Sequence, residues 1–250
     1  MMLALFSVML IYIGSLALEE QRKNDRLILS QIENSIELMH GSVQDACIAL
    51  FNNYNVVSIM YDRGIESDFG NLMLRMNIIN RSVVRTSPFI HSIYIHNGFT
   101  DTFYSSFRRL SFSDSDLLRM LEANGAPPRL TPIHRFIDEP EFSGDVLTYF
   151  HYGGLDEHMR MDGGIVANIR IEWLLHNIKR AGSPDGEDNA TVILVTDSGR
   201  MISDDSVSAP LKDLTAEYYM RHIKPLMGEE SFFQAELGGV AYSISYLPIS

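Results

Sequence analysis

The chain has 250 residues, enough for one large domain or two small ones. Its 20 Lys and Arg residues against 32 Asp and Glu residues give a formal net charge of −12, which argues against a nucleic-acid-binding surface, because such a surface needs clustered cations. The single cysteine excludes an internal disulfide and a Cys-rich zinc site, and a hydrophobic content of 46% argues against wholesale disorder.

Residues 1–18 form an apolar segment without any charged side chain. As a helix this segment would be about 27 Å long, close to the hydrocarbon thickness of a bilayer. Two interpretations are open, a cleaved signal peptide and a retained transmembrane helix. The signal peptide would have basic residues before the apolar run, and none is present. The polar residues 19–26 include no Gly or Pro and can continue the helix, so we expect a transmembrane helix over residues 1–18.

The spacing of apolar residues then predicts a long stalk helix over residues 19–62. Seven of them recur in alternating steps of three and four, which is the pattern of a coiled-coil seam: Leu29, Ile32, Ile36, Met39, Val43, Ala46 and Leu50. Gly41 is a weak point within this seam. The stripe can pack on a sheet of the same chain or on a second copy of the chain, as the stalk of a homodimer, and the two arrangements can coexist.

The periodicity changes after the stalk to that of an α/β unit, which we place at residues 63–182. A helix is expected over residues 72–85 and is ended by Pro88, and Ser113 is expected to cap a short helix over residues 114–123. A further helix is expected around Trp173. Alternation and turn residues predict strands over residues 89–96, 103–106, 146–152 and 165–171.

A second, shorter α/β unit is predicted over residues 183–250, after a linker rich in Gly, Pro and acidic residues at 181–189. Its expected elements are a strand at 191–196, a return strand at 201–203, a helix at 211–227 and a hairpin of strands 232–237 and 240–246. The pattern of the last strand is barely finished at Ser250, so we expect the unit to be truncated at its C-terminus.

Four sequence phrases carry a resemblance to a known family. They are HSIYIHNG at residues 91–98, FYSS at 103–106, GGIVANIRIEWL at 163–174 and TDSGRMIS at 196–203. Together with the membrane helix and the stalk, they resemble the double Cache extracytoplasmic sensor regions of bacterial membrane proteins. The resemblance is strongest to regulators that end in an AraC-type helix-turn-helix domain, and sensor histidine kinases have similar regions.

The resemblance implies an α/β (α+β) fold with two PAS-like antiparallel sheets. It implies that the first unit is distal from the membrane and holds a small-molecule ligand, that the second is proximal, and that residues after about 19 are extracytoplasmic. A transcription-regulator or kinase output would lie beyond residue 250. Two alternatives remain open: a protein-interaction module without a small-molecule ligand, and a lipid-tethered or secreted binding protein.

Candidate ligand-binding residues follow from the alternation of side chains along the strands. In each of three strands, one of the two alternating sets is enriched in hydrogen-bonding side chains: Tyr94 and His96, Tyr149 and His151, Asn168 and Arg170. If the other set packs on the stalk, these six residues face a pocket on the opposite side of the sheet. The competing interpretation is that they form the wet face of a half-buried sheet, since Tyr is a good strand former.

The motifs of several enzyme classes are missing from the sequence. It has no H-E-x-x-H, no G-x-S-x-G and no Gly-rich phosphate loop. His151 and His158 are seven residues apart across a Gly-Gly turn, which does not match the usual spacing of metal ligands. We therefore expect no catalytic residue, no metal site and no cofactor in this segment.

Overall fold

The computed structural model describes residues 2–64, 68–106, 114–139, 142–182, 193–195, 201–203, 221, 232–237 and 239–245. The side chains before Glu19 are outside this description. The chain divides into two compact units, one formed by Met1–Glu37 with Leu175–Ser250 and the other by Leu38–Leu174. Each unit is described by itself, and the boundaries expected from the sequence at residues 62 and 182 stay predictions.

The chain begins with helix α1 (Met2–Phe51), followed by the short helix α2 (Tyr54–Tyr61). The stalk helix expected over residues 19–62 is therefore interrupted. The break falls at two asparagines, whose side chains compete with the helix for backbone hydrogen bonds. Asn52 Nδ2 donates to the Ile48 carbonyl at 2.9 Å, and Asn53 caps α2 by accepting from the Asn55 N–H at 2.9 Å.

The expected transmembrane helix over residues 1–18 belongs to the backbone of α1, but its side chains lie outside the described residues. Among the residues that are described, no helix is long and apolar enough to cross a membrane.

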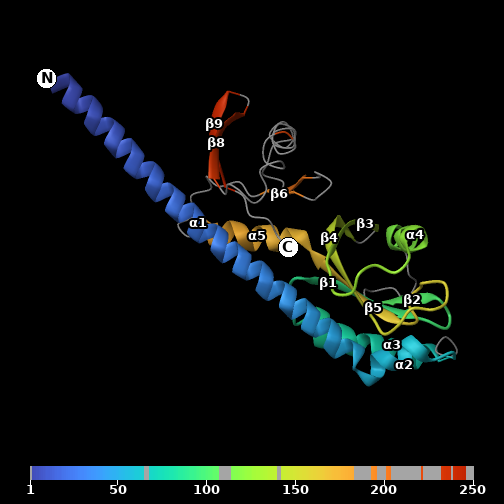
Figure 1. Cartoon of the computed structure of the whole chain (residues 1–250). Coiled ribbons are helices and arrows are strands. Elements are labelled where there is room, and N and C mark those ends of the chain that lie inside the picture. The colour runs from blue at the N-terminus through green and yellow to red at the C-terminus, as the bar shows by residue number, and fades with distance from the viewer. Residues whose placement is uncertain are drawn as a thin grey trace. The chain divides into compact units, whose positions relative to one another are not determined.

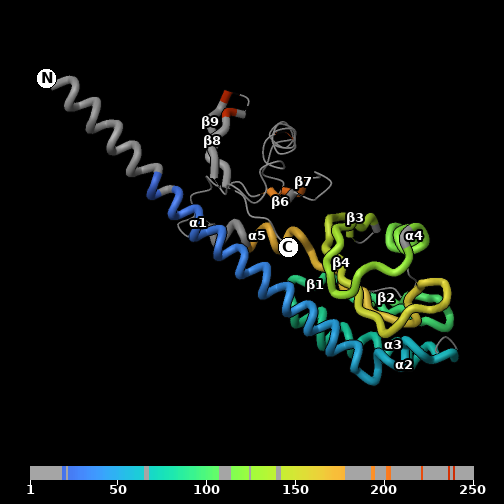
Figure 2. The backbone as a smooth tube through the Cα atoms, in the orientation of Figure 1, coloured from blue at the N-terminus to red at the C-terminus, as the bar shows by residue number. Residues whose placement is uncertain are grey.

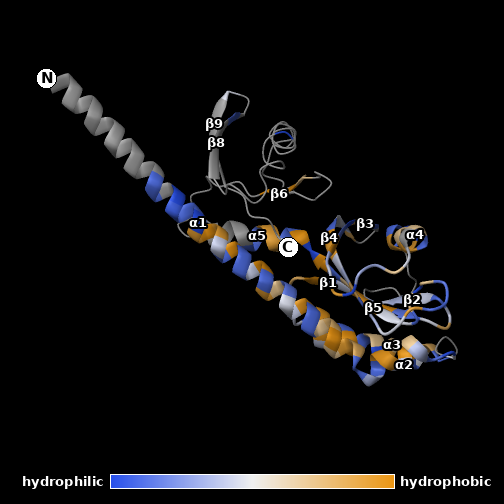
Figure 3. Cartoon of the chain, in the orientation of Figure 1, coloured by the Kyte–Doolittle hydropathy of each residue, from blue (hydrophilic) through white to orange (hydrophobic). Residues whose placement is uncertain are grey.

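The coiled-coil seam of α1 is buried within the chain over its later turns. Met39, Val43 and Leu50 are buried together with Cys47, whereas Leu38 on the opposite side of the helix is exposed. Rings on this buried side contact strand β4: His40 lies 5.4 Å from Tyr149, and Phe51 lies 4.7 Å from His151, between centroids. The hydropathy colouring shows the same apolar stripe on the half of α1 that lies beside the sheet (Figure 3).

Helix α3 (Phe69–Ile79) continues into a π-helical turn, η2 (Asn80–Val84), before the sheet begins. Asp68 starts α3 by accepting a hydrogen bond from the Asn71 N–H, and Pro88 follows η2, as expected for a residue that cannot continue a helix.

A five-stranded antiparallel sheet forms the centre of the Leu38–Leu174 unit, as Figures 1 and 2 show. Its strands occur in the order β2-β1-β5-β4-β3, so β1 and β5, the first and last of these strands in the sequence, are hydrogen-bonded neighbours. Strand β3 was not expected from the sequence. The bounds of the strands are β1 (Ile90–Asn97), β2 (Thr102–Ser105), β3 (Ile133–Glu139), β4 (Phe142–Tyr152) and β5 (Gly164–Arg170).

The two faces of this sheet are covered by different helices. α1 lies against the face of Tyr149 and His151, and α4 (Ser115–Asn124) covers the other face. On the α4 side, Leu117 packs into a cluster with Tyr94, Phe150 and Val166. Both faces are therefore dry over the central strands, which explains why all eight residues of β1 are buried.

Helix α5 (Ile171–Gly182) follows β5 directly, and two hairpins come after it in the chain. β6 (Ile193–Val195) pairs with β7 (Met201–Ser203), and β8 (Phe232–Leu237) pairs with β9 (Val240–Ser245), as the sequence predicts. The expected helix at 211–227, and most of the linker at 181–189, lie outside the described residues. The α+β class with an antiparallel sheet is confirmed, whereas the number of PAS-like units stays a prediction.

Candidate functional site

The six predicted ligand-binding residues do not share one face of the sheet. The register pairs Tyr94 with Val166 and Thr148 with Asn168, so these four lie on the α4 side. Tyr149 instead pairs with Ala167, and its hydroxyl oxygen lies 3.2 Å from Nδ1 of His40 on α1.

His151 also faces α1, where its ring contacts Phe51 edge-on. His96 and Arg170 belong to the α4 side by register, but they lie at opposite ends of the sheet, and Arg170 is exposed. The expectation of one common face is therefore wrong for Tyr149 and His151. Alternation fixes the two sets within a strand, but only the register between strands decides which set of β4 joins which set of β5.

A buried polar network occupies the centre of the α4 side. Arg135 on β3 forms a two-pronged ion pair with Asp114: Nη1 donates to Oδ1 at 3.0 Å, and Nη2 donates to Oδ2 at 2.9 Å. The side chains of this pair are only 2% and 1% exposed. Two charges removed this far from water are tolerated only when they are paired and further hydrogen-bonded.

The network continues across the sheet from Arg135. Its Nε donates to Thr148 Oγ1 at 3.0 Å, and Nη2 donates to Asn168 Oδ1 at 3.1 Å. Asn168 Nδ2 in turn donates to Ser92 Oγ at 3.0 Å. One hydrogen-bonded chain thus links β3, β4, β5 and β1 beneath α4.

Asp114 also begins helix α4, because its Oδ1 accepts the Leu117 N–H at 2.9 Å. The predicted cap, Ser113, lies outside the described residues, and the cap is one residue later than expected. The same carboxylate therefore fixes the start of α4 and neutralises Arg135, so a movement of α4 would disturb the buried ion pair directly.

A β-bulge at the start of β1 brings a second titratable group to this side. The register shifts between Ile90 and Ser92, and the ring of His91 stacks on Phe142 at 4.0 Å between centroids. Burial, and secondarily the nearby Arg170 charge, lower the pKa of His91 to about 4. His91 is therefore neutral near pH 7.

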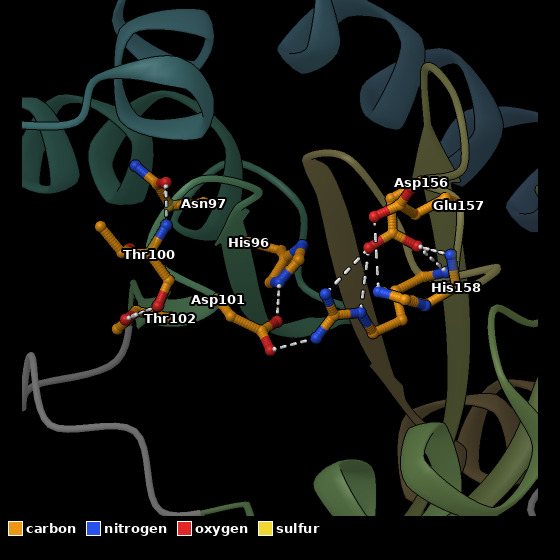
Figure 4. Close-up of polar contacts among 9 residues, drawn as sticks. His96, Asn97, Thr100, Asp101, Thr102, Asp156, Glu157 and His158 are labelled. Atoms are coloured by element: carbon orange, nitrogen blue, oxygen red, sulfur yellow. Dashed lines mark hydrogen bonds and ion pairs between the residues drawn. The ribbon is translucent and has the colours of Figure 1, made fainter.

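His96 belongs to a separate polar cluster at the end of the sheet (Figure 4). Its Nε2 donates to Asp101 Oδ1 at 2.9 Å, and Arg160 Nη1 donates to Asp101 Oδ2 at 3.2 Å. Arg160 also donates twice to Asp156, so the cluster joins the β1–β2 turn to the β4–β5 loop. Burial lowers the pKa of His96, and the bond to Asp101 opposes that shift.

This cluster holds the β1–β2 turn and the β4–β5 loop together. Asp101 and Arg160 are exposed and Asp156 is half-buried, and no described group of three or more His, Cys, Asp or Glu side chains is placed to hold a metal ion. Solvent screens such exposed pairs, so the cluster orders two loops rather than making a reactive site.

Sequence patterns did not predict the main residues of the buried network. Arg135 was missed because strand β3 was not recognised, although Ile133, Arg135 and Ile137 alternate as strand residues do. Thr148 was assigned to the helix-facing set of β4. No pattern within one strand could have shown that Asp114, 21 positions earlier, would pair with Arg135.

No family model matches this sequence, and no curated protein is significantly similar to it. Solved structures do share its fold. The extracellular domain of a protein assigned as a histidine kinase, vpHK1S-Z8, is 15% identical, with a TM-score of 0.60 over 93% of this chain and 91% of that one.

Two further solved structures have the same arrangement. The sensory domain of the Campylobacter jejuni chemoreceptor Tlp3, solved with isoleucine bound, is 13% identical, with a TM-score of 0.55 over 89% of this chain and 86% of that one. A domain assigned to a sensory box/GGDEF family protein of Vibrio parahaemolyticus is 11% identical, with a TM-score of 0.54 over 87% and 93%. The chain therefore shares the fold of these extracellular and sensory domains.

Proposed function

We propose that the chain is the extracytoplasmic ligand-sensing region of a membrane-anchored bacterial signalling protein. The observation that carries this proposal is the likeness of the fold, over 93% of the chain, to the extracellular domain of a protein assigned as a histidine kinase. In such a region a ligand stabilises one of two conformations, and the shift in population is the signal. The segment itself then needs no catalytic residue, metal or cofactor.

The ligand site of this proposal is the α4 side of the sheet in the Leu38–Leu174 unit. Its support is the buried network of Arg135, Thr148 and Asn168, because a sheet that served only as a core would gain stability from apolar side chains there. Tyr94 lies on the same side of the sheet, packed with Leu117 of α4. A small molecule with hydrogen-bonding groups is the class of ligand that this chemistry fits.

The remaining features of the proposal concern the whole protein. Residues 1–18 anchor the chain as a transmembrane helix, α1 contacts a second copy of the chain, and an AraC-type regulator follows residue 250. The AraC-type output rests on the resemblance of the sequence alone, whereas the first of the similar structures supports a histidine kinase output. A basic helix-turn-helix segment downstream would indicate the regulator, and a phosphoacceptor histidine with an ATP-binding domain would indicate the kinase.

A ligand screen tests this proposal. The thermal unfolding midpoint of the whole chain in detergent is measured against amino acids, organic acids, sugars and short peptides. We expect at least one class to raise the midpoint in a saturable way, because a ligand that binds only the folded state stabilises it. If every class leaves the midpoint unchanged, the direct small-molecule sensor is contradicted and the protein-interaction module is favoured.

A further inference from the structure

Helix α1 is tied to the end of the sheet by a line of polar contacts. Tyr149 Oη lies 3.2 Å from His40 Nδ1, and His40 Nε2 lies 2.7 Å from Gln44 Nε2. Gln44 Nε2 also donates to the Leu130 carbonyl at 3.1 Å. All four residues belong to the Leu38–Leu174 unit.

The Leu130 carbonyl can only accept a hydrogen bond, and this determines where the hydrogen atoms lie along the line of contacts. A backbone carbonyl has no hydrogen, so Gln44 must point its amide nitrogen at Leu130. The same nitrogen faces His40 Nε2, which must therefore accept a hydrogen bond and has no hydrogen. His40 is then neutral, with its hydrogen on Nδ1, where it donates to the Tyr149 hydroxyl.

Leu130 belongs to a segment that also contacts the α4 side of the unit and the backbone of β4. In this segment, residues 125–130, the Pro127 carbonyl accepts from Tyr152 Oη at 2.8 Å, and the Leu130 N–H donates to the Phe150 carbonyl at 2.7 Å. Ala126 packs against the buried cluster beneath α4. The bond from Gln44 thus connects α1 to a segment that also contacts the opposite side of the sheet.

We propose that His40 is a proton-binding site that controls this connection. A proton added at Nε2 makes the ring a donor there, so two donors, His40 and the Gln44 amide, would face each other. Gln44 relieves the conflict by rotating its amide so that Oε1 accepts from His40, and Oε1 then faces the Leu130 carbonyl, which cannot donate. Protonation therefore breaks the bond between α1 and residues 125–130.

The titratable and charged groups on the elements around His40 do not prevent its ring from binding a proton. Burial raises the pKa of Cys47 to about 12 and also raises that of Tyr149, so both stay neutral in mildly acidic solution. On β4 and the neighbouring segment, burial and the Arg129 charge lower the pKa of His151. On α1 itself, the exposed carboxylates Glu37 and Asp45 flank His40 in the sequence and are screened by solvent.

The switch itself stands on the hydrogen-bond geometry, and its value as a signal rests on the proposed function. In a sensor exposed outside the cell, it would loosen α1 from the α4 side on acidification and so make the response depend on external pH. The tests below use no ligand, so their failure would leave the ligand proposal standing, and a failed ligand screen would leave the switch standing.

The tautomer of His40 is the first test. The whole chain is labelled with ¹⁵N-histidine, and the His40 signals are assigned by their loss in His40→Gln. At pH 8 we expect Nδ1 to hold the hydrogen and Nε2 to have the chemical shift of an acceptor. A hydrogen on Nε2 at pH 8 would overturn the proposal, because Gln44 could not then donate to both His40 and Leu130.

Amide hydrogen exchange of residues 125–130 is the second test. After correction for intrinsic rates, we expect exchange across residues 125–130 to be about fivefold faster at pH 5 than at pH 8. The Leu130 N–H donates to the Phe150 carbonyl, so its exchange reports the opening of this segment, which becomes easier when the Leu130 carbonyl loses its bond to Gln44. The increase should be absent in His40→Gln and retained in His151→Gln, which is the matched control on the same interface. An increase that persists without His40, or no increase in the unaltered chain, would refute the switch. If His40→Gln does not fold, His40→Asn serves for assignment, and Gln44→Leu, which cannot donate to Leu130, serves as the uncoupled variant.

Discussion

The buried ion pair between Arg135 and Asp114 is the residue pair on which the α4 side of the sheet depends most. Asp114→Asn leaves the buried guanidinium with only the half-exposed Asp116 carboxylate, 3.7 Å from Nη1, as a counter-charge, and we expect a loss of about 3 kcal/mol in the free energy of unfolding. Urea denaturation measures this loss, with Glu122→Gln on the exposed side of α4 as the control within about 0.5 kcal/mol of the unaltered chain.

A second variant separates the ion pair from simple loss of packing. When Asp114→Asn is combined with Arg135→Met, the side-chain cap of α4 is kept and no buried charge is left unpaired, so the double variant should be more stable than Asp114→Asn alone. A double variant that is less stable than the single one would show that the charges themselves hold the unit together.

His91 makes the unit sensitive to acid. Its pKa is lowered to about 4 in the folded chain, so between this value and about 6.5 the unfolded chain binds the extra proton. The stabilisation is complete above about pH 6.5 and is lost as the pH falls toward 4, by an amount of about 3 kcal/mol. Urea denaturation at pH 7 and pH 4.5 should show a smaller acid loss in His91→Phe than in the unaltered chain, and an unchanged loss in the exposed His158→Gln. Equal acid losses in all three chains would contradict this assignment.

At the residue scale, the sequence could predict which side chains alternate but not which of them meet. Tyr94 and Asn168 were placed correctly on one side, while Tyr149 was exchanged with Thr148, because register is set by pairing across strands. The ion pair of Arg135 could not be predicted from spacing, since it joins two elements through the tertiary fold.

Two glycines show how elements meet. A Cβ on Gly98, in the β1–β2 turn, would lie 1.8 Å from the backbone oxygen of Asp162 in the β4–β5 loop, whereas a Cβ on Gly41 in α1 would meet nothing within 4 Å. We expect Gly98→Ala to lower the thermal unfolding midpoint sharply, because the two backbones must separate. Gly41→Ala should stabilise α1 by about 0.5–1 kcal/mol. A Gly98→Ala variant as stable as Gly41→Ala would show that the two loops do not pack so closely.

At the element scale, periodicity and turn residues were reliable guides where each pattern stood alone. The strands at 90–97 and 102–105 and the hairpin at 232–245 agree with the prediction within one or two residues. The end of α1 was missed because the seam continues past Asn52 and Asn53, where only side-chain hydrogen bonds stop the helix. Strand β3 was missed because a buried arginine interrupts its apolar alternation.

For the whole molecule, the fold places the candidate ligand chemistry and the stalk on opposite faces of one sheet. Because the sheet is a single hydrogen-bonded layer, a change beneath α4 can reach α1 through β4 and residues 125–130. The alternation of side chains along the strands predicted two faces with different roles. Only the register between the strands shows which residues lie on each face.

The most direct measurement of this account is the affinity of the first ligand found by the screen, determined by calorimetry for two variants of neighbouring residues on β4. Thr148 lies on the α4 side and Tyr149 on the α1 side. We predict that Thr148→Val weakens binding at least tenfold, about 1.4 kcal/mol, while Tyr149→Phe changes it less than twofold. Loss of binding in Tyr149→Phe with full binding in Thr148→Val would contradict the account.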